Sequence, residues 1–203
     1  MSLRSEKDDL RAAVLARRAA LSRAERAAYA AVLAEGGLAL ARRCAAGPIV
    51  SVFLPIRDEP DTRPLLAGLA EAGHATALPV TPPRGQPLLF RAWRSGDRLA
   101  AGRFGTAEPR AEAPLVDPDL LFVPLAAFDR RGFRLGYGAG YYDGALARLR
   151  RLKPVLAVGV AFAAQQVESV PTEPHDQRLD AVLTEAGLLT FGTDRCESSS
   201  SAT

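Results

Sequence analysis

The chain has few cysteines, few histidines and no long hydrophobic run. Its 203 residues include two cysteines, far apart at positions 44 and 196, and two histidines. A disulfide framework or a His/Cys zinc site needs more such residues in closer spacing, so the sequence excludes both. No stretch reaches the about 18 consecutive apolar residues of a membrane span, and the polar start MSLRSEKDDL lacks the apolar core of a secretory signal. We therefore expect a protein of the reducing cytoplasm with no membrane partner.

Lysine is scarce as well. Lys7 and Lys153 are the only lysines, and arginine supplies the rest of the 26 basic residues, which face 23 acidic ones for a formal net charge of +3. The arginines are scattered among acids and form no basic block interleaved with aromatics. Nucleic acid is therefore not an expected partner, whereas an anionic small molecule is compatible with this charge pattern.

The usual signatures of covalent catalysis and of two common nucleotide sites are missing. The chain has no G-x-S-x-G elbow and no cysteine close to a histidine. The glycine-rich stretch RLGYGAGYYDG (134–144) lacks the GK[ST] ending of a P-loop. It also places Tyr141 where G-x-G-x-x-G requires glycine, which disfavours a nicotinamide cofactor.

The hydrophobic pattern predicts a three-layer α/β fold with a mostly parallel sheet flanked by helices, preceded by two N-terminal helices. Helical spacing of apolar residues covers 7–21, and Ser22 with Glu25 forms a capping box for a second helix from about 23 to 43. Short apolar runs predict buried strands, and the alternation of strand and helix implies parallel pairing. The strands are expected at 49–55, 75–80, 88–93, 119–128, 154–161 and 179–185, and further helices at 63–72, 140–152 and 163–167.

The length fits one domain, which we place at residues 1–190. Residues 81–118 are rich in proline, glycine and arginine, and we interpret them as an excursion on the surface of that domain. The polar end of the chain, 191–203, is expected to be disordered. We expect a monomer.

The three alternate glycines, Gly136, Gly138 and Gly140, lie between a predicted strand and a predicted helix. Parallel α/β proteins bind ligands beyond the carboxyl ends of strands, and helix N-termini bind phosphates. Asp143 falls in the first turn of the helix. It either complements the helix dipole or binds a ligand, and the neighbouring glycines favour the ligand.

Other polar residues have two interpretations each. Asp176, in PHDQRLDAV, is explained as a turn cap or, paired with Asp143, as a second oxygen ligand for magnesium. The loop that carries Asp58 and Glu59 is either a solvated turn or part of a site. Lys7 and Arg11, four residues apart, lie on one helix face that is either solvated or in contact with phosphate. Together these groups suit phosphoryl transfer, which requires positioning and charge neutralisation more than covalent chemistry.

Four segments, KDDLR, FLPIRDEPDT, FDRRGFRLGYGAGYYD and PHDQRLDAVLTE, resemble the 5-formyltetrahydrofolate cyclo-ligase family over residues 7 to about 185. The resemblance implies a ligase that uses ATP and Mg²⁺ to convert 5-formyltetrahydrofolate to 5,10-methenyltetrahydrofolate, ADP and phosphate, by phosphorylation of the formyl oxygen.

The resemblance also implies the role of individual residues. Glu59 and Arg134 would be catalytic, Glu59 by orienting the pterin or a reacting nitrogen and Arg134 by neutralising phosphate charge. Asp143 and Asp176 would hold Mg²⁺. The folate would contact Arg11, Leu54, Glu59, Tyr137 and Tyr141, and ATP would contact Lys7, Arg11, Arg134, Leu135, Gly136, Tyr137, Gly138, Ala139, Gly140, Tyr141 and Tyr142.

The glycine-rich stretch departs from the family pattern at two positions. Many members have a lysine where this chain has Ala139 and an arginine where it has Tyr137. Arg130, Arg131 or Arg134 would then have to supply the missing positive charge. The alternatives are a folate- or nucleotide-binding homologue that has lost phosphoryl transfer, and a related ATP-using enzyme that acts on another heterocycle.

Overall fold

The centre of the protein is a seven-stranded sheet. The computed structural model describes residues 2–44, 47–83 and 85–192. The strands run in the order β11-β10-β9-β6-β1-β2-β3, and the inner pairs from β10 to β2 are all parallel. Only the edge strands β3 and β11 are antiparallel to their neighbours. Their bounds are β1 Ile49–Ser51, β2 Ala75–Val80, β3 Leu89–Ala92, β6 Leu120–Pro124, β9 Leu156–Val160, β10 Ala181–Thr184 and β11 Gly187–Thr190.

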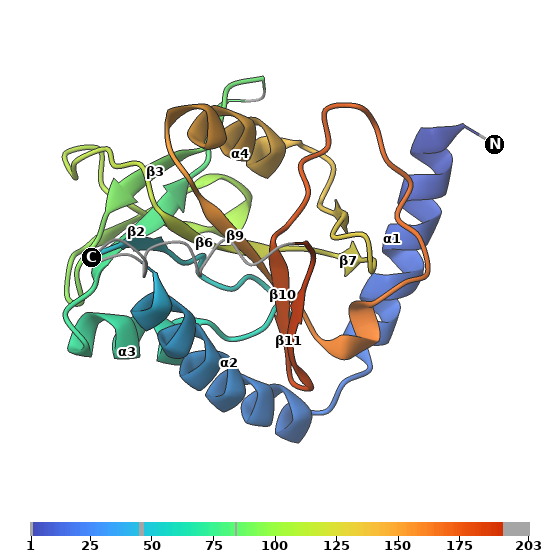
Figure 1. Cartoon of the computed structure of the whole chain (residues 1–203), viewed down its shortest axis with the longest axis horizontal. Helices are drawn as coiled ribbons and strands as arrows, with labels where there is room; N and C mark the ends of the chain where they lie inside the picture. The colour runs from blue at the N-terminus through green and yellow to red at the C-terminus, as the bar shows by residue number, and fades with distance from the viewer. Residues whose placement is uncertain (1, 45–46, 84, 193–203) are drawn as a thin grey trace, which may run out of the picture.

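Helices cover both faces of the sheet, as Figure 1 shows. The helices α2 (Arg23–Arg43) and α3 (Arg63–Glu71) pack on one face, where Tyr29, Leu65 and Phe122 belong to one buried cluster. On the other face α4 (Tyr141–Leu152) contributes Leu146 and Leu149 to a second cluster. The mostly parallel three-layer α/β fold is therefore confirmed.

The first two helices agree closely with the sequence pattern. The helix α1 (Leu3–Ala19) begins a few residues before the predicted start, because the Ser2 side chain caps it. The helix α2 begins at the capping box that Ser22 and Glu25 form. Gly37 lies in the middle of α2, where a Cβ atom would come within 2.6 Å of a Leu65 methyl group, so this glycine allows the close approach of α3.

The structure departs from the prediction where chain segments pair locally. The excursion 81–118 carries, besides β3, a small hairpin of β4 (Leu99–Ala101) and β5 (Ala107–Pro109), with the 3₁₀ helix η1 (Arg103–Gly105) between them. The predicted helix at 163–167 is the short 3₁₀ helix η2 (Ala163–Gln165). The prediction that β10 is the last strand is wrong, because β11 folds back onto it at Gly187, whose φ of +116° favours glycine.

Two predicted strands are shorter than their apolar runs. The run 49–55 forms a strand only over β1, and its last residues leave the sheet toward the cavity described below. The run 119–128 ends as β6 at Pro124, and β7 (Ala127–Phe128) then pairs with β8 (Arg134–Leu135) in a separate hairpin. Of the predicted disordered tail, 193–203 lies outside the described residues, whereas the Phe191 amide donates to the Asp180 carbonyl.

Candidate active site

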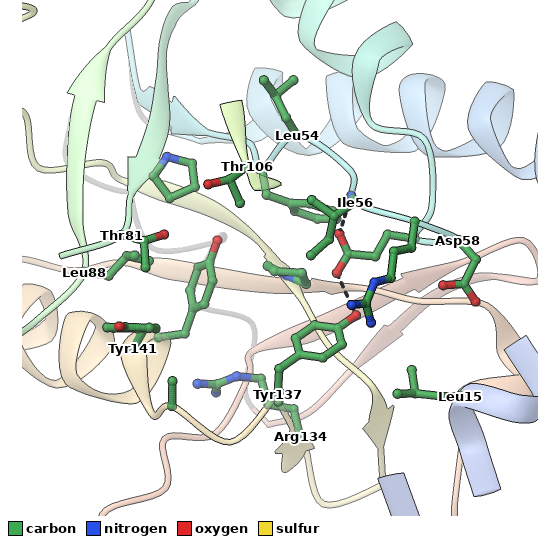
Figure 2. Close-up of a pocket in the computed structure, with 18 of the residues that line it drawn as sticks. Leu15, Leu54, Ile56, Asp58, Thr81, Leu88, Thr106, Arg134, Tyr137 and Tyr141 are labelled. Carbon is green, nitrogen blue, oxygen red and sulfur yellow. Dashed lines mark hydrogen bonds between the residues drawn. The ribbon is translucent and has the colours of Figure 1, made fainter. Parts of the chain in front are cut away.

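A cavity of about 660 Å³ lies at the carboxyl ends of the parallel strands. The segments that follow β1 and β2 supply Leu54 and Thr81, and β6 supplies its last residue, Pro124. The glycine stretch and α1 close the other sides. Figure 2 shows Tyr137 and Tyr141 reaching into the cavity from one side, with Leu54 and Ile56 across from them. This is the edge of the sheet where open α/β folds bind ligands.

The glycine stretch leads directly into α4. Gly138 has a φ of +93° and Gly140, the residue before the helix, a φ of +66°. Both conformations strain residues with a side chain, which explains these two glycines. A Cβ atom at Gly140 would meet nothing within 4 Å, so the start of the helix is open to the cavity. Since no side chain in the described part of the chain caps α4, its first amide groups remain able to bind an anion.

Arg134 is a buried cation beside this helix start. Its guanidinium donates to Asp143 Oδ1 at 2.8 Å and to the Gln177 carbonyl at 2.6 Å, and only 3% of the side chain is exposed. Burial lowers the pKa of Arg134, and the charge of Asp143 opposes this effect. The hairpin of β7 and β8 holds Arg134 in place through Asp129, which is fully buried and accepts from the amides of Arg131 and Phe133.

Asp143 and Asp176 lie on adjoining segments. Asp143 Oδ1 also accepts from the amide of Gln177, the residue after Asp176, and both carboxylates act on the pKa of Arg134. Asp143 lines the cavity, whereas Asp176 does not. Asp176 Oδ2 accepts from Lys7 Nζ at 3.1 Å, and its other oxygen lies 3.8 Å from His175 Nε2.

Each of the two carboxylates keeps one oxygen with no hydrogen bond among the described residues: Oδ2 of Asp143 and Oδ1 of Asp176. Carboxylate oxygens are the ligands that Mg²⁺ prefers. The donor set therefore fits a magnesium ion. Glu173, His175 and Asp176 also bring ligand atoms within 4.8 Å of one another at the surface, but Lys7 already pairs with two of these three residues.

One face of α1 lies along the glycine stretch and the loop after β1. Lys7 reaches Glu173 and Asp176, and these carboxylates raise its pKa although burial, the largest single influence, lowers it. Arg11 Nε donates to the Gly136 carbonyl at 2.8 Å. Arg18, seven residues further and so on the same face, pairs with Asp58. The helix therefore places three cations on one face, of which Arg18 lines the cavity.

Glu59 and Tyr137 are joined by a short hydrogen bond. The Tyr137 hydroxyl donates to Glu59 Oε1 at 2.6 Å, and the Ile56 amide donates to Oε2 at 3.0 Å. Burial raises the pKa of Glu59, and the two hydrogen bonds work in the opposite direction. Glu59 is 8% exposed, whereas Tyr137 is 45% exposed, so the ring of Tyr137 remains accessible to a ligand.

The last two tyrosines of the stretch differ in their partners. The Tyr141 hydroxyl donates to the Pro82 carbonyl at 3.0 Å, which ties the glycine stretch to the excursion 81–118. The Tyr142 hydroxyl is buried and has no hydrogen-bond partner among the described residues. Burial raises the pKa of Tyr142, and the charges of Glu59 and Arg134 also act on it, so the hydroxyl lies in the field of both groups.

The structure brings most of the predicted site residues to one cavity and leaves some outside its lining. The predicted residues that line the cavity are Leu54, Glu59, Arg134, Gly136, Tyr137, Ala139, Gly140, Tyr141, Tyr142 and Asp143. Lys7, Arg11, Gly138 and Asp176 are not part of the lining. The side chain of Leu135 packs in a core cluster with Val14 and Val170, so this residue can meet a nucleotide only through its backbone.

Sequence reasoning missed two cations of the cavity, Arg18 and Arg57. The signal for Arg18 is its place two helical turns after Arg11. Of the three arginines considered as replacements for the missing lysine, only Arg134 lines the cavity. Arg131 pairs with Asp129 instead, and Arg130 is exposed.

A family model described as the 5-formyltetrahydrofolate cyclo-ligase family matches residues 3–185. This chain belongs to that family of enzymes. Among its cyclo-ligase relatives, the Mycolicibacterium smegmatis enzyme is 35% identical over 91% of this chain and 95% of its own length. The Escherichia coli K12 enzyme is 39% identical over 66% of this chain and 76% of its own length.

A solved structure supports the same assignment. The 5,10-methenyltetrahydrofolate synthetase of Aquifex aeolicus superposes with a TM-score of 0.72 at 31% identity, over 93% of this chain and 94% of the other. The cavity described above is therefore the candidate active site of a cyclo-ligase family member. Within the described ranges, the helices are too short or too polar to cross a membrane.

Proposed function

We propose that the protein catalyses the ATP- and Mg²⁺-dependent cyclisation of 5-formyltetrahydrofolate to 5,10-methenyltetrahydrofolate, with release of ADP and phosphate. The observation that carries the proposal is the composition of one cavity. An apolar, tyrosine-lined part with a buried carboxylate, Glu59, continues into an open helix start with a buried cation, Arg134, and a carboxylate, Asp143.

The first part suits the folate. The cavity as a whole, at about 660 Å³, lies in the range of pockets that take drug-sized ligands. Leu54, Tyr137 and Tyr141 offer apolar and aromatic surface to a flat heterocycle, and Glu59 offers oxygen acceptors to its N–H groups. Arg11, beside Gly136 at the rim, is a candidate partner for the negative charge of the folate.

The second part suits a triphosphate. The start of α4, Arg134, and Lys7 and Arg11 of α1 provide positive charge on several sides. The free oxygens of Asp143 and Asp176 would hold Mg²⁺. When bound, Mg-ATP supplies the phosphoryl group that turns the formyl oxygen into a leaving group.

The protein's own residues position the reacting atoms. A formyl amide is a poor electrophile and its oxygen is a poor leaving group, so the reaction needs activation of that oxygen before the neighbouring arylamine nitrogen of the folate closes the ring. Because the substrate contains its own nucleophile, no residue has to form a covalent bond. Glu59 orients the heterocycle, and Arg134 stabilises the charge that develops on the oxygens.

A second candidate is a homologue that binds folate or nucleotide without phosphoryl transfer, and Ala139 in place of a common lysine favours it. The cavity nevertheless keeps Arg134, beside the start of α4, and Arg57 in its lining. We therefore expect turnover.

The test is an assay with 5-formyltetrahydrofolate and Mg-ATP that follows the near-ultraviolet absorbance of the methenyl product. We expect product with the wild-type protein and none with Asp143→Ala. Asp117→Ala is the matched control, because Asp117 also pairs with an arginine, Arg148, at 2.7 Å but lies outside the cavity lining. Folate binding without turnover would favour the second candidate. Heat stabilisation by Mg-ATP but not by folate would indicate another heterocyclic substrate.

A further inference from the structure

Arg18 is a buried arginine in the cavity wall to which the proposed chemistry gives no role. Its side chain is 3% exposed, and each hydrogen bond of that side chain goes to a residue of the cavity lining. Its Nε and Nη2 donate to the two oxygens of Asp58, at 3.1 and 2.7 Å, and its Nη1 donates to the Tyr137 hydroxyl at 2.8 Å. Tyr137 in turn donates to Glu59.

The direction of this chain of hydrogen bonds follows from the chemistry of its members. A guanidinium has donors only, so the Tyr137 oxygen must accept from Arg18. The single hydroxyl proton of Tyr137 is then available to Glu59 Oε1, at 2.6 Å. The Ile56 amide donates to Oε2. Both oxygens of Glu59 therefore accept from the protein, which favours the ionised carboxylate and fixes its orientation.

The same arrangement leaves room for a ligand. A carboxylate offers about four acceptor positions, and the protein uses one on each oxygen of Glu59. If Arg18 bonded Glu59 directly, its fork of donors would occupy more of these positions. The guanidinium of Arg18 instead donates to Asp58, and Glu59 receives a single hydrogen bond from the Tyr137 hydroxyl. About two acceptor positions of Glu59 remain for N–H donors in the cavity.

We propose that Arg18 and Tyr137 are positioning residues that hold Glu59 as an oriented carboxylate acceptor for the N–H groups of the folate ring. The inference rests on the proposed function for the identity of the ligand. Arg18 does not touch the substrate in this arrangement, and it acts through Tyr137. The carboxylate of Asp58 balances the charge of Arg18 and sets the angle of its guanidinium.

The test compares the affinity for 5-formyltetrahydrofolate of wild type and Tyr137→Phe by titration calorimetry between pH 5.5 and 8.5. The variant keeps the aromatic ring and removes one hydrogen bond to a charged group. We expect a dissociation constant about tenfold higher at pH 7.5, with the affinity for Mg-ATP unchanged. The variant removes a hydrogen bond that stabilises ionised Glu59, so the pKa of Glu59 should rise. As the pH is lowered, folate affinity should therefore begin to fall at a higher pH than in the wild type.

Variants of Arg18 separate positioning from packing. Arg18→Met should weaken folate binding and shift the pH dependence in the same direction as Tyr137→Phe, and Arg18→Lys should restore part of the affinity because it keeps a donor. The matched control is Arg26→Met. Arg26 donates to the carbonyls of Arg18 and Asp58, so it joins the same segments without touching Tyr137 or Glu59. We expect this control to lower the melting temperature without moving the pH dependence.

Unchanged folate affinity in Tyr137→Phe would overturn the inference. So would a loss of affinity with an unmoved pH dependence, because a change in packing alone lowers the affinity without altering the ionisation of Glu59. Absence of turnover in the wild type would contradict the proposed function instead. The binding comparison does not depend on turnover, so it still decides whether Arg18 and Tyr137 position Glu59.

Discussion

Replacement of Tyr142 by phenylalanine should make the free protein more stable and the enzyme slower. The Tyr142 hydroxyl is buried, and none of the described residues forms a hydrogen bond with it. An unsatisfied buried polar group costs about 1–3 kcal/mol. Its removal by Tyr142→Phe keeps the ring in place and should recover part of that cost. For a domain of this size, 1 kcal/mol corresponds to a rise in melting temperature of about 2–4 °C.

The same substitution, Tyr142→Phe, should lower the turnover rate. Tyr142 lines the cavity, in the field of both Glu59 and Arg134, so we expect its hydroxyl to find a partner in the bound substrates. One neutral hydrogen bond contributes about 0.5–1.5 kcal/mol, which corresponds to a fall in kcat of up to about tenfold. A merely structural hydroxyl would not combine a more stable free protein with slower turnover.

The assay is thermal unfolding without ligands, together with the methenyl absorbance assay. Tyr29→Phe is the matched control, because the Tyr29 hydroxyl is equally buried but donates to the Leu183 carbonyl and accepts from the Ala161 amide. We expect this control to lower the melting temperature. A lower melting temperature for Tyr142→Phe, or a kcat equal to that of the wild type, would refute the reasoning.

Three further predictions concern stability and metal binding. Gly37→Ala should destabilise the protein by about 1–3 kcal/mol in urea unfolding, because its Cβ would press on Leu65, while Gly144→Ala, also inside a helix but with no atom within 4 Å of the added Cβ, should not destabilise it. Asp129→Asn should cost about 1–3 kcal/mol and lower kcat, since the buried Asp129 carboxylate accepts from the amides of Arg131, Phe133 and Val170 and the amide nitrogen of Asn could not accept in its place. Mg²⁺ added with ATP should raise the melting temperature more than ATP alone, and Asp143→Asn should remove that increment. An equal increment in the variant would contradict the assignment of Asp143 as a magnesium ligand.

The local pattern of the sequence was sufficient for most of the architecture. Ser22 and Glu25 determine the start of α2 through contacts three residues apart, and the alternation of apolar runs with helical segments implies a parallel sheet. The glycines before Asp143 could be placed at a helix start for the same reason. Each of these features depends on neighbours in the chain, so it can be recognised without knowing what packs against it.

Only the tertiary structure decided which polar groups meet. Arg18 and Tyr137 are separated by 119 residues, and Tyr137 and Glu59 by 78, so no spacing in the chain could reveal their hydrogen bonds. The strand β11 and the hairpin of β4 and β5 were missed for a related reason, because short strands form where a partner edge is available rather than where the sequence alone favours them. The residue types therefore indicate the chemistry in advance, while the folding of distant segments onto one sheet edge determines which groups can act together.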